Sequence, residues 1–153
     1  MNLWLTLHLV GVLLMVGNII TAAFWKIRAD LTKNPSIIHQ AAKNVMIADY
    51  SFTLPGLILI IISGAVMAGH SGVSLLGLNW LTLSLLLFAI SGIIWLAILL
   101  PLQFRMIRFS ADSVRAGAIS AAYRRASRQW AIYGVAATFL PLVILYFMVM
   151  KGF

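Results

Sequence analysis

The sequence contains no cysteine and no glutamate, and its only acidic residues are Asp30, Asp49 and Asp112. The absence of cysteine excludes disulfide bonds, thiolate metal sites and iron–sulfur clusters. Charged residues make up only 9% of the chain, whereas an average soluble domain carries about 25%. So few charges cannot give a domain of this size a surface that water solvates well. The composition therefore excludes an ordinary soluble protein.

Apolar residues take the place of the missing charges, at 63% of the 153 residues. They gather in four runs of about 20 residues, at 3–24, 49–69, 81–102 and 130–150. A helix of about 20 residues crosses about 30 Å of hydrocarbon and satisfies its own backbone hydrogen bonds there. Short connections between consecutive helices favour antiparallel neighbours. The sequence therefore predicts a single all-α integral membrane domain, folded as an antiparallel four-helix transmembrane bundle.

The net charge of +8 is concentrated in two of the connections. Four lysines and arginines lie in 25–48 and six lie in 103–129, whereas 70–80 has none. Cytoplasmic connections of membrane proteins are enriched in lysine and arginine. We therefore predict a protein of the bacterial cytoplasmic membrane with both basic connections inside and both termini outside. The basic segments are expected to rest on anionic lipid of the bilayer and not on nucleic acid.

Tryptophan marks the ends of the apolar runs, at Trp4, Trp25, Trp80 and Trp130. Tryptophan is enriched at membrane–water interfaces because its ring is apolar and its N–H is polar. We interpret all four as interfacial anchors.

Polar and small residues form stripes on the first two predicted helices. The second helix carries Asp49, Gly56, Ser63 and His70 at seven-residue spacing, with Met67 between the last two. The first helix carries a comparable stripe through His8 and Asn18. Such residues pack helices together in lipid, so both stripes are predicted to face the bundle interior. We expect Asn18 to bond across helices, and Asp49 to begin the second helix near cytoplasmic arginines.

The histidines supply the candidate cofactor ligands. The first helix runs inward and the second outward, so His8 and His70 are both predicted near the outer leaflet. Two imidazoles facing each other across a bundle can hold haem b, and a His8/Met67 pair, closer in depth, is the alternative. The same three side chains could instead hold copper. The remaining histidine, His39, is expected to be solvated, and no catalytic residue is evident.

Several short stretches resemble domain-of-unknown-function family 2269, a family of predicted bacterial integral membrane proteins. They are Trp4-Leu5-Thr6-Leu7-His8-Leu9, the stretch from Asp49 through Pro55-Gly56 to Ser63-Gly64, and Asn79-Trp80. More distantly, the chain is similar to HemJ-type protoporphyrinogen oxidases and to the CopD copper-resistance membrane domain. In the HemJ-type proteins a first-helix histidine, matched here by His8, is implicated in haem b binding. The chain lacks the tyrosine- and histidine-bearing stretch that follows their first helix, so the resemblance implies a cofactor more than an oxidase activity.

Three functions remain open on the sequence alone. The first is a small membrane protein that binds haem b near the outer leaflet; as an enzyme it would be a membrane oxidoreductase. The second is a non-enzymatic accessory or scaffold protein whose polar stripes bind a partner subunit or a second copy. The third is a component that handles copper or transports a substrate.

Overall fold

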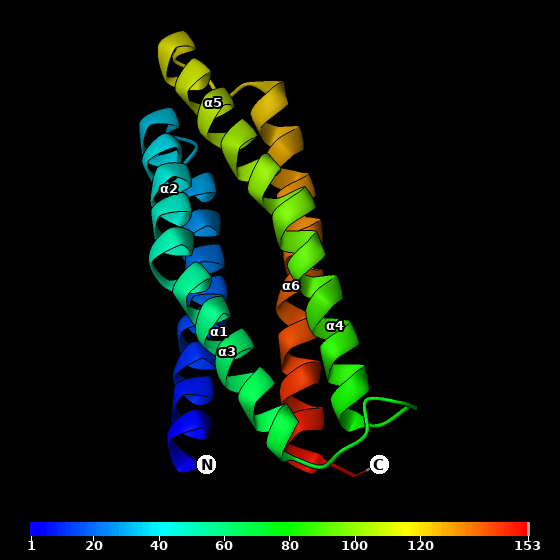
Figure 1. Ribbon diagram of the computed structural model, residues 1–153. Helices are drawn as coiled ribbons and strands as arrows, with labels where there is room; N and C mark the ends of the chain where they lie inside the picture. The colour runs from blue at the N-terminus through cyan, green and yellow to red at the C-terminus, as the bar shows by residue number, and fades with distance from the viewer. Residues whose placement is uncertain (153) are drawn as a thin grey trace.

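The computed structural model describes residues 1–152 as four long helices joined by short connections (Figure 1). The first is α1 (Asn2–Leu31), and the fourth is α6 (Ala121–Met150). The second runs through α2 (Pro35–Ala48), η1 (Asp49–Thr53) and α3 (Leu54–His70), and the third through α4 (Trp80–Ile94), η2 (Trp95–Leu99) and α5 (Leu100–Ala116). All four are long and apolar enough to cross a membrane. The prediction of an all-α, four-helix transmembrane bundle is confirmed.

Helix continues through most of the two basic connections. Only residues 32–34 separate α1 from α2, and only residues 117–120 separate α5 from α6. Asn34 caps α2 by accepting hydrogen bonds from the backbone N–H groups of Ser36 and Ile37, and Gly117 ends α5 with a φ of 72°. The helices therefore extend well beyond the apolar runs.

The extensions are held by their own amphipathic faces. The buried side of α2 presents Ile38, Ala42 and Val45, and the buried side of α5 presents Leu102 and Met106. These faces pack against each other and against α6 in the main apolar core. The core therefore lies in the half of the molecule that carries the basic connections.

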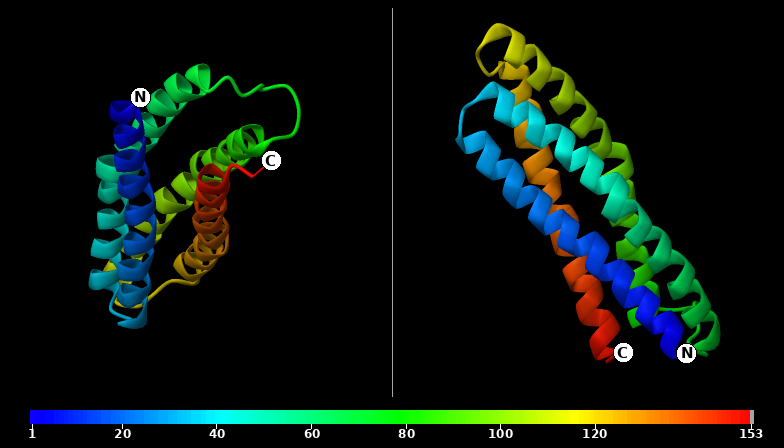
Figure 2. Two further views of the ribbon diagram at one scale, coloured as in Figure 1. Left: turned by 90° about the horizontal axis from the view of Figure 1, so that it is seen from below. Right: turned by 90° about the vertical axis from the view of Figure 1, so that its left-hand side faces the viewer.

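The four long helices form two pairs. α1 packs along α3, and α4 packs along α6, while α2 and α5 join the pairs in the half that holds the core. Figures 1 and 2 show that the two pairs diverge toward the other half, where both termini lie. The centre of the molecule, where the pairs begin to separate, is therefore lined by all four long helices.

Two glycines bring the backbones of α1 and α3 into contact. A Cβ atom on Gly56 would lie 2.7 Å from the carbonyl oxygen of Gly11, and one on Gly11 would lie 2.8 Å from the carbonyl oxygen of Gly56. Small residues allow this close approach of helices in lipid. The contact fixes a register in which Asn18 faces Asp49 and His8 faces Ser63.

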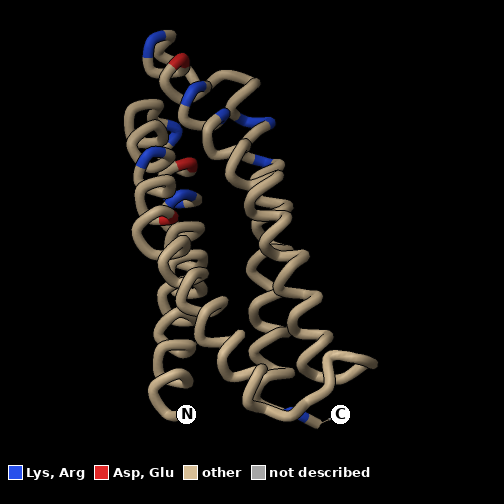
Figure 3. Tube along the Cα trace, viewed as in Figure 1, with Lys and Arg blue, Asp and Glu red and all other residues tan. Residues whose placement is uncertain are grey.

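Charge is segregated along the bundle (Figure 3). Lysine and arginine gather at the end formed by residues 32–34 and 117–120, which we call the basic end. The opposite end, called the terminal end, holds both termini and the 71–79 connection, with Lys151 as its basic residue.

Candidate functional site

Asp49 lies at the centre of the bundle, with only 5% of its surface exposed. Because helix is continuous from Pro35 to His70, Asp49 sits in its middle and does not begin it, in contrast to our expectation. It faces Asn18, which precedes the end of the first apolar run by six residues, or about 9 Å. The carboxyl group is therefore inside the apolar part of the bundle.

Four neutral donors hold this carboxylate. Asn18 Nδ2 and Thr53 Oγ1 each donate to Oδ1 at 2.9 Å. Gln103 Nε2 donates to Oδ2 at 2.7 Å, and Trp95 Nε1 lies 3.4 Å from the same oxygen. The donors come from the first three long helices, so the carboxylate ties the two helix pairs together.

No arginine or lysine pairs with Asp49 in the described residues 1–152, where the ion pairs are Lys26–Asp30 and Arg115–Asp112. The expected contact with cytoplasmic arginines is absent because those side chains lie toward the basic end of longer helices. A buried charge without an opposite charge is costly. An acidic group kept in such a place is by default a candidate functional group.

Wide helical turns flank the site on both sides. The π-helical segments η1 and η2 begin at Asp49 and Trp95, and each is followed by a Leu-Pro pair. Pro55 and Pro101 have no N–H to donate to the residue four positions earlier, which interrupts the regular α-helical hydrogen bonds. π-helical turns occur frequently at functional sites. Here they carry four side chains of the site: Asp49, Thr53, Trp95 and Leu99.

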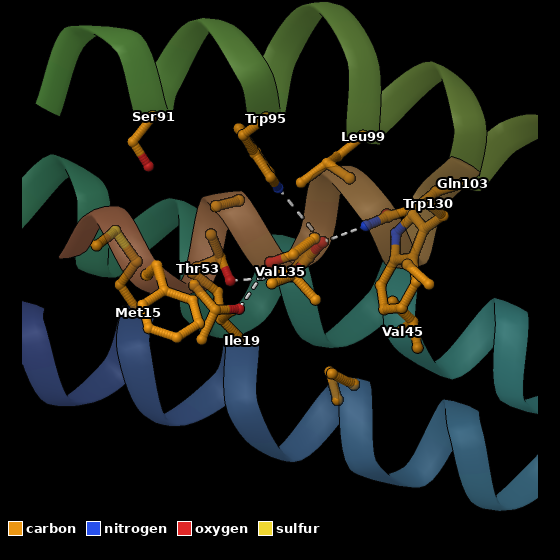
Figure 4. A pocket seen from close by; sticks show the side chains of 18 of the residues that line it. Met15, Ile19, Val45, Thr53, Ser91, Trp95, Leu99, Gln103, Trp130 and Val135 are labelled. Atoms are coloured by element: carbon orange, nitrogen blue, oxygen red, sulfur yellow. Dashed lines mark hydrogen bonds between the residues drawn. The ribbon is translucent and has the colours of Figure 1, made fainter. Parts of the chain in front are cut away.

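A cavity of about 270 Å³ adjoins Asp49 and is lined mostly by apolar side chains from all four long helices. Figure 4 shows Trp95 and Gln103 reaching toward the centre of the site, with Thr53 opposite. Gln103 and Trp130, two of the lining residues, each carry a buried polar atom, Oε1 and Nε1, without a hydrogen-bond partner within residues 1–152, and both atoms are almost completely enclosed by protein. Their residues are only 2% and 7% exposed. Each unsatisfied buried polar atom costs about 1–3 kcal/mol, so the packing around these two side chains is costly.

A second polar group, the Lys26 cluster, consists of Lys26, Asp30, Tyr123 and Ser127 and links α1 to α6. Lys26 Nζ donates to Asp30 Oδ2 at 2.5 Å and to Ser127 Oγ. Tyr123 donates to Asp30 Oδ1 at 2.6 Å. The ammonium group also lies 5.2 Å from the centre of the Trp130 ring. Trp130 therefore separates this ion pair from the cavity.

The predicted cofactor ligands lie in the half toward the terminal end. His8 Nδ1 and Ser63 Oγ are 3.1 Å apart, and the ring lies against Gly64. His70 is exposed, and its Nδ1 donates to the carbonyl oxygen of Val66 in its own helix. The His8 ring lies at the level of Ser63 and Gly64 on α3. His70 follows Gly64 by six residues, so it lies about 9 Å further along the helix, and half-buried Met67 lies between them. The structure thus brings His8 to Ser63 and not to His70.

Within residues 1–152, no three histidine, aspartate or glutamate side chains lie close enough together to hold a metal ion. His39 Nδ1 lies 2.8 Å from Ser110 Oγ, so His39 is half-buried between α2 and α5 and is not the solvated residue we expected.

Several residues of the site were missed in the sequence. Gln103 falls in a predicted connection because charged residues follow it, and Trp130 is predicted to be an interfacial anchor. Trp130 is instead buried in the core, whereas Trp25 is exposed as an anchor would be. Two of the three Leu-Pro pairs, at 54–55 and 100–101, follow an irregular turn beside the site, whereas the third, at 140–141, lies within α6.

Comparison with protein families matches residues 2–152 to the family described as predicted integral membrane protein (DUF2269). Comparison with curated proteins and with solved structures gives no match. The matched range includes all four long helices, Asp49, the cavity and His8. The chain therefore belongs to the DUF2269 family of predicted integral membrane proteins.

Proposed function

We propose that the protein is an intramembrane binding protein for a lipophilic small molecule, whose polar head lies between Asp49, Gln103 and Trp130. The observation that carries this proposal is the mostly apolar cavity of about 270 Å³, lined from all four long helices, with Asp49, Gln103 and Trp130 among its lining residues. Ligand sites are typically apolar cavities with a few polar groups, as here.

The route to the cavity is from the lipid. Its lining includes Val135 and Phe139, whose side chains are largely exposed on the outside of α6. In a membrane-spanning helix these exposed apolar faces meet lipid chains. A lipophilic molecule can therefore enter sideways from the bilayer.

We further propose that the basic end lies in the cytoplasm of a bacterium and that both termini lie outside its cytoplasmic membrane. The segregation of lysine and arginine in Figure 3 supports this orientation. The cavity then lies in the inner half of the bilayer, because Asp49 is nearer to the basic end of the first apolar run than to its start.

Protein purified in polymer-bounded native membrane discs should carry one lipophilic molecule per chain, detected by native mass spectrometry after release of bulk lipid. Gln103→Leu and Trp130→Phe should each reduce the retained fraction about tenfold, because each removes one of the few polar groups around the apolar cavity. Trp130→Phe keeps an aromatic ring beneath Lys26.

The matched controls are Gln129→Leu and Trp25→Phe, which change the same residue types at exposed positions. Both should leave retention unchanged. An accessory scaffold protein would carry no specific small molecule, so equal retention in all five proteins would contradict the proposal.

Haem b at His8 is the second candidate function. Ser63 Oγ donates to the carbonyl oxygen of Leu59, so it accepts from His8 Nδ1–H and leaves His8 Nε2 free to act as a ligand. Because His70 lies further along α3, Met67 is the nearer of the two predicted partners of His8, and the proposed axial pair is His8 with Met67.

Reduced protein from haem-replete cells should then show a Soret band, and His8→Ala should abolish it. His70→Ala is the control and should leave the band unchanged. Absence of visible absorption in the unmodified protein would rule out haem and leave the cavity proposal as it stands.

A further inference from the structure

A groove of about 710 Å³ runs between α1 and α2, which lie side by side in the half of the bundle toward the basic end (Figure 2). Its walls are residues that recur at three- or four-residue spacing, from Asn18 to Thr32 on α1 and from Ile37 to Ala48 on α2. Asn18 and Thr32 are 14 positions apart, so the groove extends about 21 Å along α1. It opens on the outside of the bundle, because much of its polar lining is exposed.

The groove crosses the boundary between lipid chains and lipid head groups. Its deeper part, from Asn18 to Ala22, lies in the first apolar run, which ends at Phe24. Trp25 follows and is 66% exposed, as expected of a tryptophan that anchors a helix at the level of the head groups. Arg28 lies three residues, or about 4.5 Å, further toward the basic end. A molecule lying along the groove therefore places an apolar chain toward Asn18 and a head group beside Arg28.

Arg28 gives the groove a positive charge without an acidic partner. It is exposed, and the ion pairs within residues 1–152 join other residues, Lys26 to Asp30 and Arg115 to Asp112. A guanidinium group binds phosphate oxygens through two parallel hydrogen bonds, which makes phosphate its complementary head group.

The remaining polar lining distinguishes between phospholipid head groups. Gln40 Nε2 donates to Asn44 Oδ1 at 3.1 Å, which leaves Gln40 Oε1 to accept and Asn44 Nδ2 to donate. These neutral groups can bond the hydroxyls of a glycerol head group. The described lining of the groove has no carboxylate, so a choline head group would bring a second positive charge beside Arg28 with nothing opposite it. Basic pockets between membrane helices bind anionic head groups in the same way.

We propose that this groove binds one anionic phospholipid of the phosphatidylglycerol type. Its phosphate lies at Arg28, its glycerol head group lies near Gln40 and Asn44, and one acyl chain follows the groove toward Asn18. This lipid site goes beyond the proposed small-molecule function and does not depend on it.

Two lipids with the same acyl chains test the proposal, dioleoylphosphatidylglycerol and dioleoylphosphatidylcholine. Each is titrated into the full-length protein in detergent, and bound lipid is counted by native mass spectrometry. Phosphatidylglycerol should saturate at one molecule per chain and bind at least about tenfold more tightly than phosphatidylcholine. Arg28→Gln should remove most of this preference. Ala41→Leu, which fills the groove and keeps every charge, should weaken both lipids.

The matched control is Arg125→Gln, which removes the same charge from an exposed arginine of α6 outside the groove. It should leave the preference intact. Equal losses in Arg28→Gln and Arg125→Gln would overturn the proposal, since the charge of the basic end as a whole would then attract the lipid. Undiminished phosphatidylglycerol binding in Ala41→Leu would also overturn it, because the lipid would then lie outside the groove.

One further variant separates this lipid site from the proposed function. Gln103→Leu should leave phosphatidylglycerol binding unchanged, and Arg28→Gln should leave retention of the small molecule at the Asp49 cavity unchanged. Loss of phosphatidylglycerol binding in Gln103→Leu would contradict a separate site between α1 and α2.

Discussion

Replacing Lys26 with methionine should lower the free energy of unfolding by about 3–5 kcal/mol, because it leaves the partly buried carboxylate of Asp30 without its cation. Lys26 is 2% exposed, so water cannot replace its contacts. The substitution keeps the length and apolar stem of the side chain, and removes the charge that links α1 to Ser127 of α6. Unfolding by denaturant in mixed detergent micelles, followed by circular dichroism, measures the change.

Arg115→Met is the matched control. Arg115 and Asp112 form an ion pair at 3.7 Å, but their side chains are 81% and 55% exposed. Exposed pairs contribute about 0–1 kcal/mol, so this substitution should have little effect. A loss in Lys26→Met no larger than that in Arg115→Met would show that the Lys26 cluster does not hold the helices together.

Replacing Gly56 with alanine should separate α1 from α3 and lower the free energy of unfolding by about 1–3 kcal/mol. The new methyl group would lie 2.7 Å from the carbonyl oxygen of Gly11 and 2.9 Å from the backbone nitrogen of Met15. Both are backbone atoms, so neither can move without shifting the helix. The shift also moves Asn18 away from Asp49, so retention of a lipophilic molecule should fall along with stability.

Gly17→Ala separates this contact from the general effect of alanine on a helix. A Cβ atom on Gly17 would meet nothing within 4 Å, and alanine is the better helix former by about 0.8–1.0 kcal/mol. Gly17→Ala should therefore be neutral or stabilising. Equal unfolding curves for the two variants would contradict the close backbone contact of α1 and α3.

The site could be predicted only in part from the sequence. Asn18 bonds across helices to Asp49 and Thr53, as expected, and Ser63 is buried against α1. These residues could be found because polar side chains in an apolar run must turn toward other helices. The position of Gln103 in the site cannot be predicted from the sequence. Nothing about a single glutamine beside charged residues indicates that the helix continues there or that this side chain faces the bundle interior.

The interpretation of tryptophan shows the same limit. Trp25 and Trp130 occupy similar places in the sequence, each at the basic end of an apolar run. Trp25 is exposed, whereas Trp130 lies under Lys26 and lines the cavity. Rotation of the helix about its axis separates the two cases, and that rotation is set by packing against neighbouring helices.

The sequence by itself determined the class of protein, the four membrane-crossing helices and the concentration of basic residues in two connections. These follow from local composition, since a run of about 20 apolar residues in lipid must form a helix whatever surrounds it. Only the tertiary structure decided that Asp49 meets Gln103 and Trp95, that Gln103 and Trp130 line one cavity, and that His8 faces Ser63. These contacts depend on the depth and rotation at which each helix packs, which arise from close approaches such as that of Gly11 and Gly56 between segments far apart in the chain.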